Sequence, residues 1–194
     1  MDSSERRHGD DAITAKTLLA RLRFLEERLG AAGRARVLQK LPREDQDILG
    51  GIVLPVARYP LLLNARLDTA IADEIDPLNP KRVFRTLGRS SAEVNFDQFH
   101  AILISRDDPH VVMSRIGAMR RLYYEDGEFS YERVGPTTAR IVVRNMATVT
   151  TPDCESTAGF YEVAIARSSG RDVVVRHTCR LQGAPDCSFD CSWR

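Results

Sequence analysis

The carboxy-terminal stretch 173–194, VVVRHTCRLQGAPDCSFDCSWR, decides the fold class of this chain. Apolar and polar residues alternate on both sides of its centre, which is the pattern of a half-buried antiparallel strand pair. The residues that share the inward face are Val173, Val175, His177, Cys179 and Leu181 on the first strand, and Cys187, Phe189, Cys191 and Trp193 on the second. Three of the four cysteines of the chain therefore lie on one face of one predicted hairpin.

The register of this hairpin follows from the shared face. Residues that pair across two strands must point into the same core, so the two paired residue numbers must add to an even sum. A three-residue connection at 183–185 meets this condition. It predicts Cys179 opposite Phe189 and His177 opposite Cys191.

Length and composition predict one globular domain. The chain has 194 residues, of which 43% are hydrophobic, and a net charge of +1. We expect a disordered amino terminus over 1–11 and a single domain over 12–194. Basic residues form no stripe, which excludes nucleic acid as an expected partner, and the longest apolar run, 48–57, is too short to insert into a membrane. Without a recognisable targeting segment we expect a cytoplasmic protein, in which cysteines are thiols or metal ligands rather than disulfides.

The order of elements predicts an α+β fold. A helical part covers 12–105, with helices expected over 18–29, 34–41, 61–75, 81–87 and 92–104. The remaining part, 106–194, reads as helix, hairpin, helix, hairpin. Its elements are expected over 109–125, 129–134, 139–146, 154–168 and the final hairpin, with Asp153 capping the helix that Cys154 opens.

This second part resembles the 4-vinyl reductase-like ligand-binding domain, which shares a fold group with TRAPP subunits and haem NO-binding domains. The resemblance rests on the element order, on the helix end Leu122-Tyr123-Tyr124-x-x-Gly127, on Cys154 at a helix start, and on the segment from Cys179 to Cys187. The helical part upstream is similar to that of myxobacterial proteins of this kind.

The resemblance implies a zinc site. In phenol-sensing activators with this domain, a structural zinc is held by three cysteines and a glutamate, and the three cysteines match Cys154, Cys179 and Cys187. The glutamate position is Arg176 here, which removes one ligand and is expected to place a positive charge near the metal. His177 or Cys191 is available as a substitute, because both share the inner face and zinc accepts thiolate or imidazole ligands. The alternative is that these cysteines fill the core as small apolar residues.

The resemblance also implies an apolar cavity between helices and sheet, suited to an acyl chain or an aromatic compound. Its expected lining is Tyr123, Phe160, Phe189 and Trp193. Residues of these types are equally expected in a filled core, so the sequence leaves cavity and core open.

The expected function is that of a non-enzymatic sensor or adaptor for a small apolar molecule, acting as a homodimer and signalling to a separate output protein. One alternative is a dimeric interaction scaffold of the TRAPP type, with apolar residues around 61–63 and 111–112 as its face. A haem-based gas sensor, with His100 as the iron ligand, is less favoured, because the Tyr-x-Ser-x-Arg haem signature is absent and 130–133 replaces it poorly. We therefore do not expect haem, and zinc binding stays open beside the filled-core alternative. No nucleophile, phosphate-binding or zinc-protease motif is present, so we expect no catalytic residues.

Overall fold

The computed structural model describes residues 11–98, 108–124 and 127–194, with the backbone alone for Gln98 and residues 117–122. The predicted disordered segment 1–11 lies outside the described residues except for Asp11, whose carbonyl accepts a hydrogen bond from the Leu61 amide at 2.7 Å. The described elements are β1 (Ala12–Thr14), α1 (Ala15–Gln39), α2 (Arg43–Gly50), β2 (Arg58–Pro60), α3 (Leu61–Ile75), α4 (Pro80–Gln98), α5 (Pro109–Tyr123), β3 (Glu128–Gly135), β4 (Thr138–Arg144), α6 (Thr151–Ala166), β5 (Val174–Thr178), the 3-10 turn η2 (Arg180–Gln182) and β6 (Cys187–Ser192).

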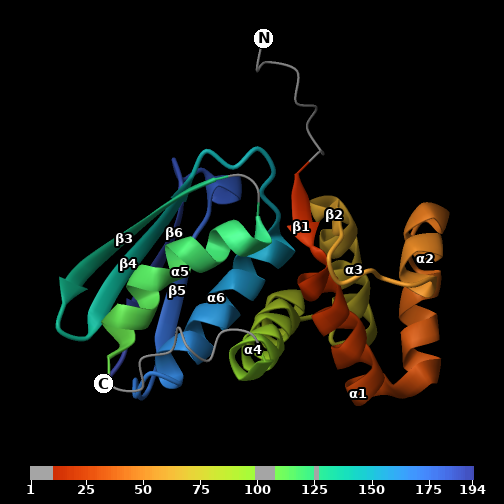
Figure 1. Cartoon of the computed structure of the whole chain (residues 1–194), viewed down its shortest axis with the longest axis horizontal. Helices are drawn as coiled ribbons and strands as arrows, with labels where there is room; N and C mark the ends of the chain where they lie inside the picture. The colour runs from red at the N-terminus through yellow and green to blue at the C-terminus, as the bar shows by residue number, and fades with distance from the viewer. Residues whose placement is uncertain (1–10, 99–107, 125–126) are drawn as a thin grey trace, which may run out of the picture.

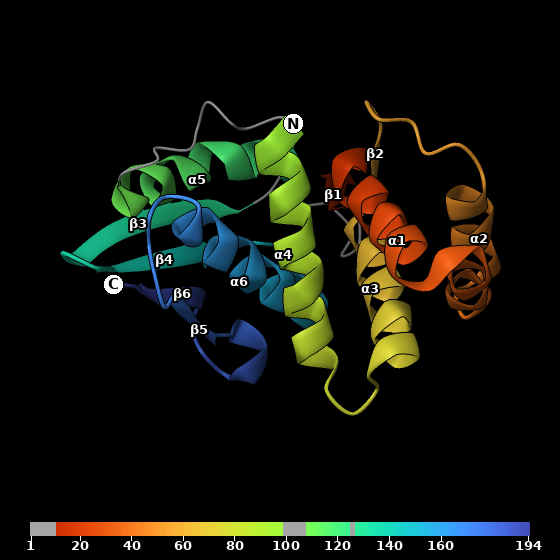
Figure 2. The ribbon, with the colours of Figure 1, turned by 90° about the horizontal axis from the view of Figure 1, so that it is seen from below.

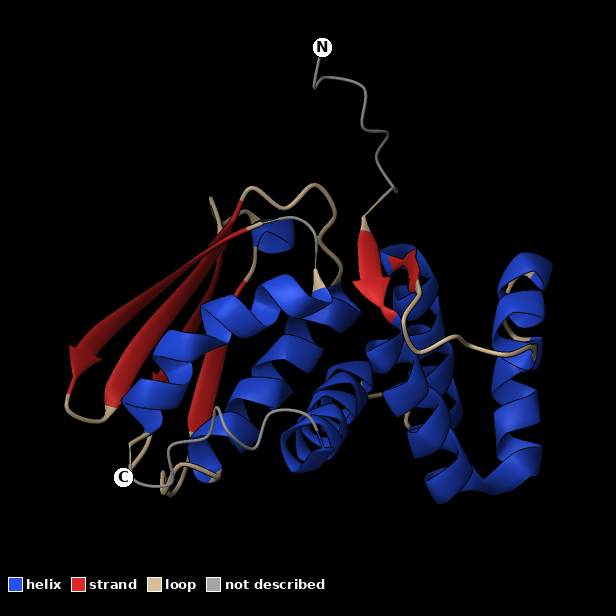
Figure 3. Cartoon of the chain, viewed as in Figure 1, coloured by secondary structure: helices blue, strands red, loops and turns tan. Residues whose placement is uncertain are grey.

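The predicted α+β fold is confirmed. An antiparallel sheet with strand order β3-β4-β6-β5 carries α5 and α6 on one face, and α4 lies between most of α6 and the helices α1 to α3 (Figures 1 and 3). A short pair, β1 with β2, lies beside the amino-terminal helices and was not predicted. Within the described residues, no helix combines the length and the apolar character needed to cross a bilayer.

The final hairpin has the predicted faces except at Leu181, which lies in η2 and is exposed, and the predicted register is wrong by two residues. Val175 pairs with Cys191 and His177 pairs with Phe189. Strand β5 ends at Thr178 because the chain turns into η2, which closes at a left-handed residue, Gly183, with φ of 89°. The connection is therefore longer than three residues, and the shifted register brings the end of β5 level with the start of β6.

One helix, α4, replaces the two helices predicted on either side of Gly88. Gly88 is not a helix end but the point where α4 crosses α6. A Cβ at this position would lie 1.8 Å from the backbone oxygen of Ser156, and one at Gly159 in α6 would lie 2.1 Å from the oxygen of Arg85. The two glycines allow two helix backbones to approach closely (Figure 2).

The helix end predicted at Gly30 is observed as a kink within a longer helix. Helix α1 runs through this position, but Gly30 has φ of 65° and ψ of −178°, outside helical values. The start of α6 differs from prediction, because Thr150 rather than Asp153 is the N-cap and its hydroxyl accepts from the Asp153 amide at 3.3 Å. The helix predicted over 61–75 is confirmed as α3.

The apolar core has two parts that meet near Tyr124. One lies between the sheet, α5 and α6, and the other among α1, α2, α3 and the start of α4. Leu61, Leu63 and Val112 are buried in these cores. They are therefore not available for the helical dimer face that the scaffold alternative places around them, and the homodimer stays a prediction.

Candidate metal centre and ligand pocket

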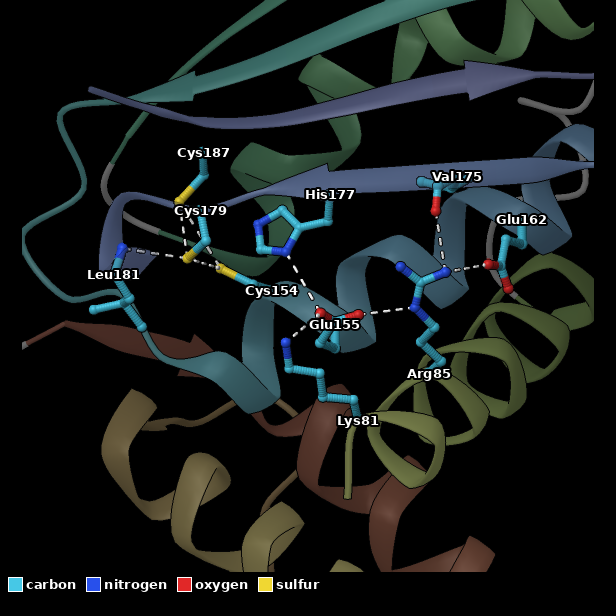
Figure 4. A network of polar contacts seen from close by, with 10 residues as sticks. All are labelled: Lys81, Arg85, Cys154, Glu155, Glu162, Val175, His177, Cys179, Leu181 and Cys187. Atoms are coloured by element: carbon cyan, nitrogen blue, oxygen red, sulfur yellow. Dashed lines mark hydrogen bonds and ion pairs between the residues drawn. The ribbon is translucent and has the colours of Figure 1, made fainter. Parts of the chain in front are cut away.

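Three structural elements bring a group of cysteines together at one end of the sheet. Cys154 lies in the first turn of α6, Cys179 directly follows β5, and Cys187 begins β6. In the observed register, Cys179 lies level with Cys187 at the end of β5. Helix α6 packs against this end of the sheet and brings Cys154 close to both (Figure 4). All three side chains are buried.

The spacing of the three sulfurs matches a tetrahedral metal site. The Sγ–Sγ distances are 3.9 Å from Cys154 to Cys187, 4.0 Å from Cys179 to Cys154, and 4.0 Å from Cys179 to Cys187. Zinc–sulfur bonds of about 2.3 Å in a tetrahedron put sulfurs about 3.8 Å apart. The Leu181 amide also donates to Cys179 Sγ at 3.4 Å, which fixes the direction of that side chain.

His177 supplies a fourth ligand atom. The ligand atoms of Cys154, His177, Cys179 and Cys187 all lie within 4.8 Å of one another. The His177 ring is stacked on Phe189, and its Nε2 is buried without a hydrogen-bond partner among the described residues. Figure 4 shows this nitrogen facing the cysteines. A metal ion held by the three cysteines would satisfy this buried nitrogen, which otherwise has the Cys187 thiol as its polar neighbour.

Glu155 holds the other side of the imidazole. Its Oε1 lies 3.7 Å from His177 Nδ1, and Arg85 Nε donates to its Oε2 at 2.8 Å. Burial alone would raise the pKa of Glu155, but the contacts with His177 and Arg85 outweigh it and lower the pKa to about 2. A carboxylate behind the ligating histidine is the usual arrangement that fixes the ring in metal sites. The residues present therefore fit a Cys3His zinc site.

The three thiols differ in acidity. Hydrogen bonding from Cys154 and from the Arg180 amide outweighs burial and lowers the pKa of Cys187 to about 5. The hydrogen bond to Cys187, together with burial, raises the pKa of Cys154. Metal binding would displace the protons that these thiols carry.

Two sequence-based expectations about this site need correction. Cys191, the other candidate fourth ligand, lies four residues along an extended strand from Cys187, a distance of about 13 Å, and its Sγ contacts the Phe189 carbonyl instead. Arg176 lies on the exposed outer face of the sheet, level with Asp190. Its charge therefore does not approach the cysteines.

A pocket of about 70 Å³ opens among α1, α4, α5 and α6. Its apolar wall consists of Ile116, Tyr123, Tyr124, Phe160 and Tyr161, and its polar wall of Thr17, Arg21, Ser91, Asn95, Asp153, Ser156 and Thr157. The structure therefore holds an unfilled space at this position rather than a fully packed core.

The four predicted pocket residues divide into two pairs. Tyr123 and Phe160 line the pocket, and burial raises the pKa of Tyr123. Phe189 instead packs between His177 and Tyr161, with ring centroids 4.7 and 5.1 Å away. Trp193 packs against His110 at 4.8 Å. The second pair belongs to the filled part of the core beneath the sheet.

The polar wall of the pocket was missed by sequence reasoning. Arg21 is 2% exposed and forms an ion pair with Asp68, which is fully buried, at 2.7 Å. Arg21 also donates to Ser91 and Ser156, so one guanidinium links α1, α3, α4 and α6. One signal was present: Arg21 follows Leu18 by three residues and precedes Leu25 by four, which places it on the apolar stripe of α1.

His100, the haem ligand of the gas-sensor alternative, lies outside the described residues. The two histidines of the described part are His110 and His177, and neither lines the pocket. His110 is buried, with its Nδ1 2.5 Å from the Tyr131 hydroxyl and its Nε2 2.8 Å from the Pro136 carbonyl.

No protein-family model matches this chain, and no curated protein matches its sequence. Among solved structures, the unliganded Fe(II) H-NOX protein from K. algicida is similar with a TM-score of 0.74 at 12% identity, over 94% of this chain and 97% of that one. The S. oneidensis H-NOX protein in the Fe(II)NO ligation state gives 0.73 at 12% identity, over 94% and 99%. A Cs H-NOX mutant gives 0.69 at 9%, over 94% and 97%. At such identities the likeness shows the fold, which is that of H-NOX domains, the fold group in which the sequence placed the chain.

Proposed function

We propose that this chain is a non-enzymatic sensor or adaptor domain that binds a small molecule in the pocket among α1, α4, α5 and α6 and is stabilised by zinc. The observation that carries the proposal is the pocket itself. Protein interiors pack with few voids, yet this space persists between aromatic rings and a buried polar wall where the two parts of the core meet.

The position of the pocket suits a sensor. Its residues come from α1 in the amino-terminal part and from α4, α5 and α6 in the second part. A ligand that contacts all four helices binds one arrangement of them more tightly than others. Such a difference in affinity between two conformations shifts the equilibrium toward the tighter-binding one. A separate output protein would then recognise the stabilised arrangement. We expect no catalysis at this site.

The zinc would act as a structural element. Cys154, His177, Cys179 and Cys187 offer four ligand atoms, which leaves no position for substrate, as in closed structural sites. Bound there, the metal would tie the start of α6 to β5 and β6. Because α6 also lines the pocket through Ser156 and Phe160, the zinc would hold one wall of the pocket against the sheet.

The described residues favour a ligand smaller than haem. Pockets for drug-sized ligands measure roughly 300–1,000 Å³, a haem is no smaller than such a ligand, and this pocket measures about 70 Å³. No histidine of the described part lines it. The H-NOX fold nevertheless makes haem the alternative that a test must address, and the absorption spectrum of the purified protein addresses it directly.

Native mass spectrometry of the freshly purified chain, compared with the denatured sample, tests the proposal. We expect one zinc per chain in the native spectrum, no Soret band in the absorption spectrum, and a retained or added small organic molecule. The same spectrum reports whether the chain is a homodimer. A chain that carries haem, or that binds no small molecule in a screen of apolar compounds, contradicts the proposal.

A further inference from the structure

Two serine hydroxyls in the pocket have hydrogen-bonding capacity that the protein does not use. Ser91 in α4 and Ser156 in α6 are both more than nine-tenths buried. Each Oγ accepts a hydrogen bond from Arg21, the one to Ser156 at 2.6 Å. Within the described part of the chain neither hydroxyl donates a bond, although each carries one O–H donor. Both line the pocket, so both donors are available to whatever occupies it.

Arg21 itself is not available to a ligand. Its Nε donates to the Asp68 carboxylate at 2.7 Å, and its Nη2 donates to the same carboxylate at 3.1 Å. Its Nη1 donates to the Leu87 carbonyl at 3.1 Å. With the two serines, these bonds use all five N–H donors of a guanidinium. The Asp68 carboxylate balances the positive charge of Arg21, and Asp153 adds a negative charge to the polar wall. An anionic ligand would therefore be desolvated without a countercharge, which is costly.

The hydroxyls are placed to be strong donors. A hydroxyl that accepts from a guanidinium is polarised, because chains of hydrogen bonds strengthen one another in a low-dielectric interior. Ser91 in α4 and Ser156 in α6 accept from the two Nη atoms of one guanidinium, which brings the two hydroxyls near each other in the pocket. The same pocket is lined by the apolar surfaces of Ile116, Phe160 and Tyr161.

We propose that the ligand is a small neutral carbonyl compound whose oxygen accepts hydrogen bonds from Ser91 and Ser156 while its apolar part contacts the aromatic wall. This inference rests on the proposed function, because it names the ligand class of the same pocket. The pocket size sets an upper limit on the ligand. A single water needs about 10–15 Å³, so about 70 Å³ suits a compact molecule of roughly five to seven atoms of that size.

Cyclopentanone and methylenecyclopentane provide the test, because they differ only in an oxygen or a CH2 group at the same position. Binding to the full, zinc-loaded chain is followed by two-dimensional NMR. We expect cyclopentanone to bind about a hundredfold more tightly than methylenecyclopentane, about tenfold for each of the two hydrogen bonds. In Ser91→Ala and in Ser156→Ala the affinity for cyclopentanone should fall about tenfold, while the affinity for methylenecyclopentane stays within twofold.

Ser90→Ala is the matched control, because Ser90 is the neighbouring serine of α4 but does not line the pocket. It should leave both affinities unchanged. Because the two compounds are compared on the unaltered chain as well, the test does not depend on the folding of any variant.

The inference is overturned if methylenecyclopentane binds as tightly as cyclopentanone, and in that case the pocket of the proposed function stands. It is also overturned if neither compound binds but xenon shifts the resonances of the pocket residues, since the pocket is then real and selects a different class. If xenon shifts none of them either, both the inference and the proposed function fail.

Discussion

Replacing Arg21 tests the buried network that forms the polar wall of the pocket. In Arg21→Met the Asp68 carboxylate keeps its fully buried position but loses its ion pair at 2.7 Å. Removing one partner of a buried pair costs about 3–5 kcal/mol, a large part of the roughly 5–15 kcal/mol that holds a domain folded. We expect a loss of this size in the free energy of unfolding, measured by urea denaturation followed by circular dichroism.

The double variant Arg21→Met with Asp68→Leu isolates the charge. Replacing both members of a buried ion pair by apolar residues is often neutral or stabilising. Because Ser91, Ser156 and the Leu87 carbonyl still lose their Arg21 contacts, we expect the double variant to recover about half of the loss. A double variant no more stable than Arg21→Met, or a single variant that loses less than about 1 kcal/mol, would refute the reasoning.

The loss in Arg21→Met should depend on pH. Burial raises the pKa of Asp68 above its ordinary value of 3.8, and Arg21 opposes that effect. Without Arg21 the folded-state pKa rises further above the unfolded value. A group with a raised folded pKa contributes stability that is present below the unfolded pKa and is lost as the pH rises through the folded one. Arg21→Met should therefore regain stability relative to the double variant as the pH falls from neutrality toward 3.8.

Further predictions concern the helix crossing and the metal. Gly88→Ala should cost about 1–3 kcal/mol, as overpacking does, because its Cβ would lie 1.8 Å from a backbone oxygen, whereas Gly50→Ala, with nothing within 4 Å, should change the urea midpoint little. Removing zinc with a chelator should lower the melting temperature by roughly 8–16 °C relative to a sample with free zinc at a thousandfold excess over Kd; an unchanged melting temperature would rule out a structural zinc. Glu155→Gln should weaken zinc binding about 10–100-fold in a chelator competition, and Glu162→Gln, which shares the Arg85 contact but does not contact the histidine, should not. Cys191→Ser should retain the zinc, and loss of the metal would show that the fourth ligand is misassigned.

Local patterns in the sequence predicted the faces of the strands but not their register. The alternation in 173–194 has a period of two, so it correctly places His177 and Cys187 on the inner face. The register depends on where β5 ends, and the chain leaves the strand at Thr178, four residues before the predicted connection at 183–185. Gly88 was wrongly predicted to end a helix, because the local sequence does not show which element packs against it. A glycine that permits a close helix crossing has the same local signature as one that ends a helix.

The candidate site was predictable only in part. The family resemblance supplied three cysteines, and the choice of His177 over Cys191 required the three-dimensional arrangement. The polar wall of the pocket depends on contacts between residues that lie far apart in the sequence. Arg21 appears as one charge among several on a helix, and its burial makes sense only once Asp68 and two serines from other helices surround it.

X-ray absorption spectroscopy of the zinc-loaded chain tests the central claim most directly, because it reports the atoms bound to the metal. The arrangement of Cys154, His177, Cys179 and Cys187 predicts three sulfurs at about 2.3 Å and one nitrogen at about 2.0–2.1 Å. A first shell with two or four sulfurs, one with oxygen in place of the nitrogen, or a chain that retains no zinc would contradict it.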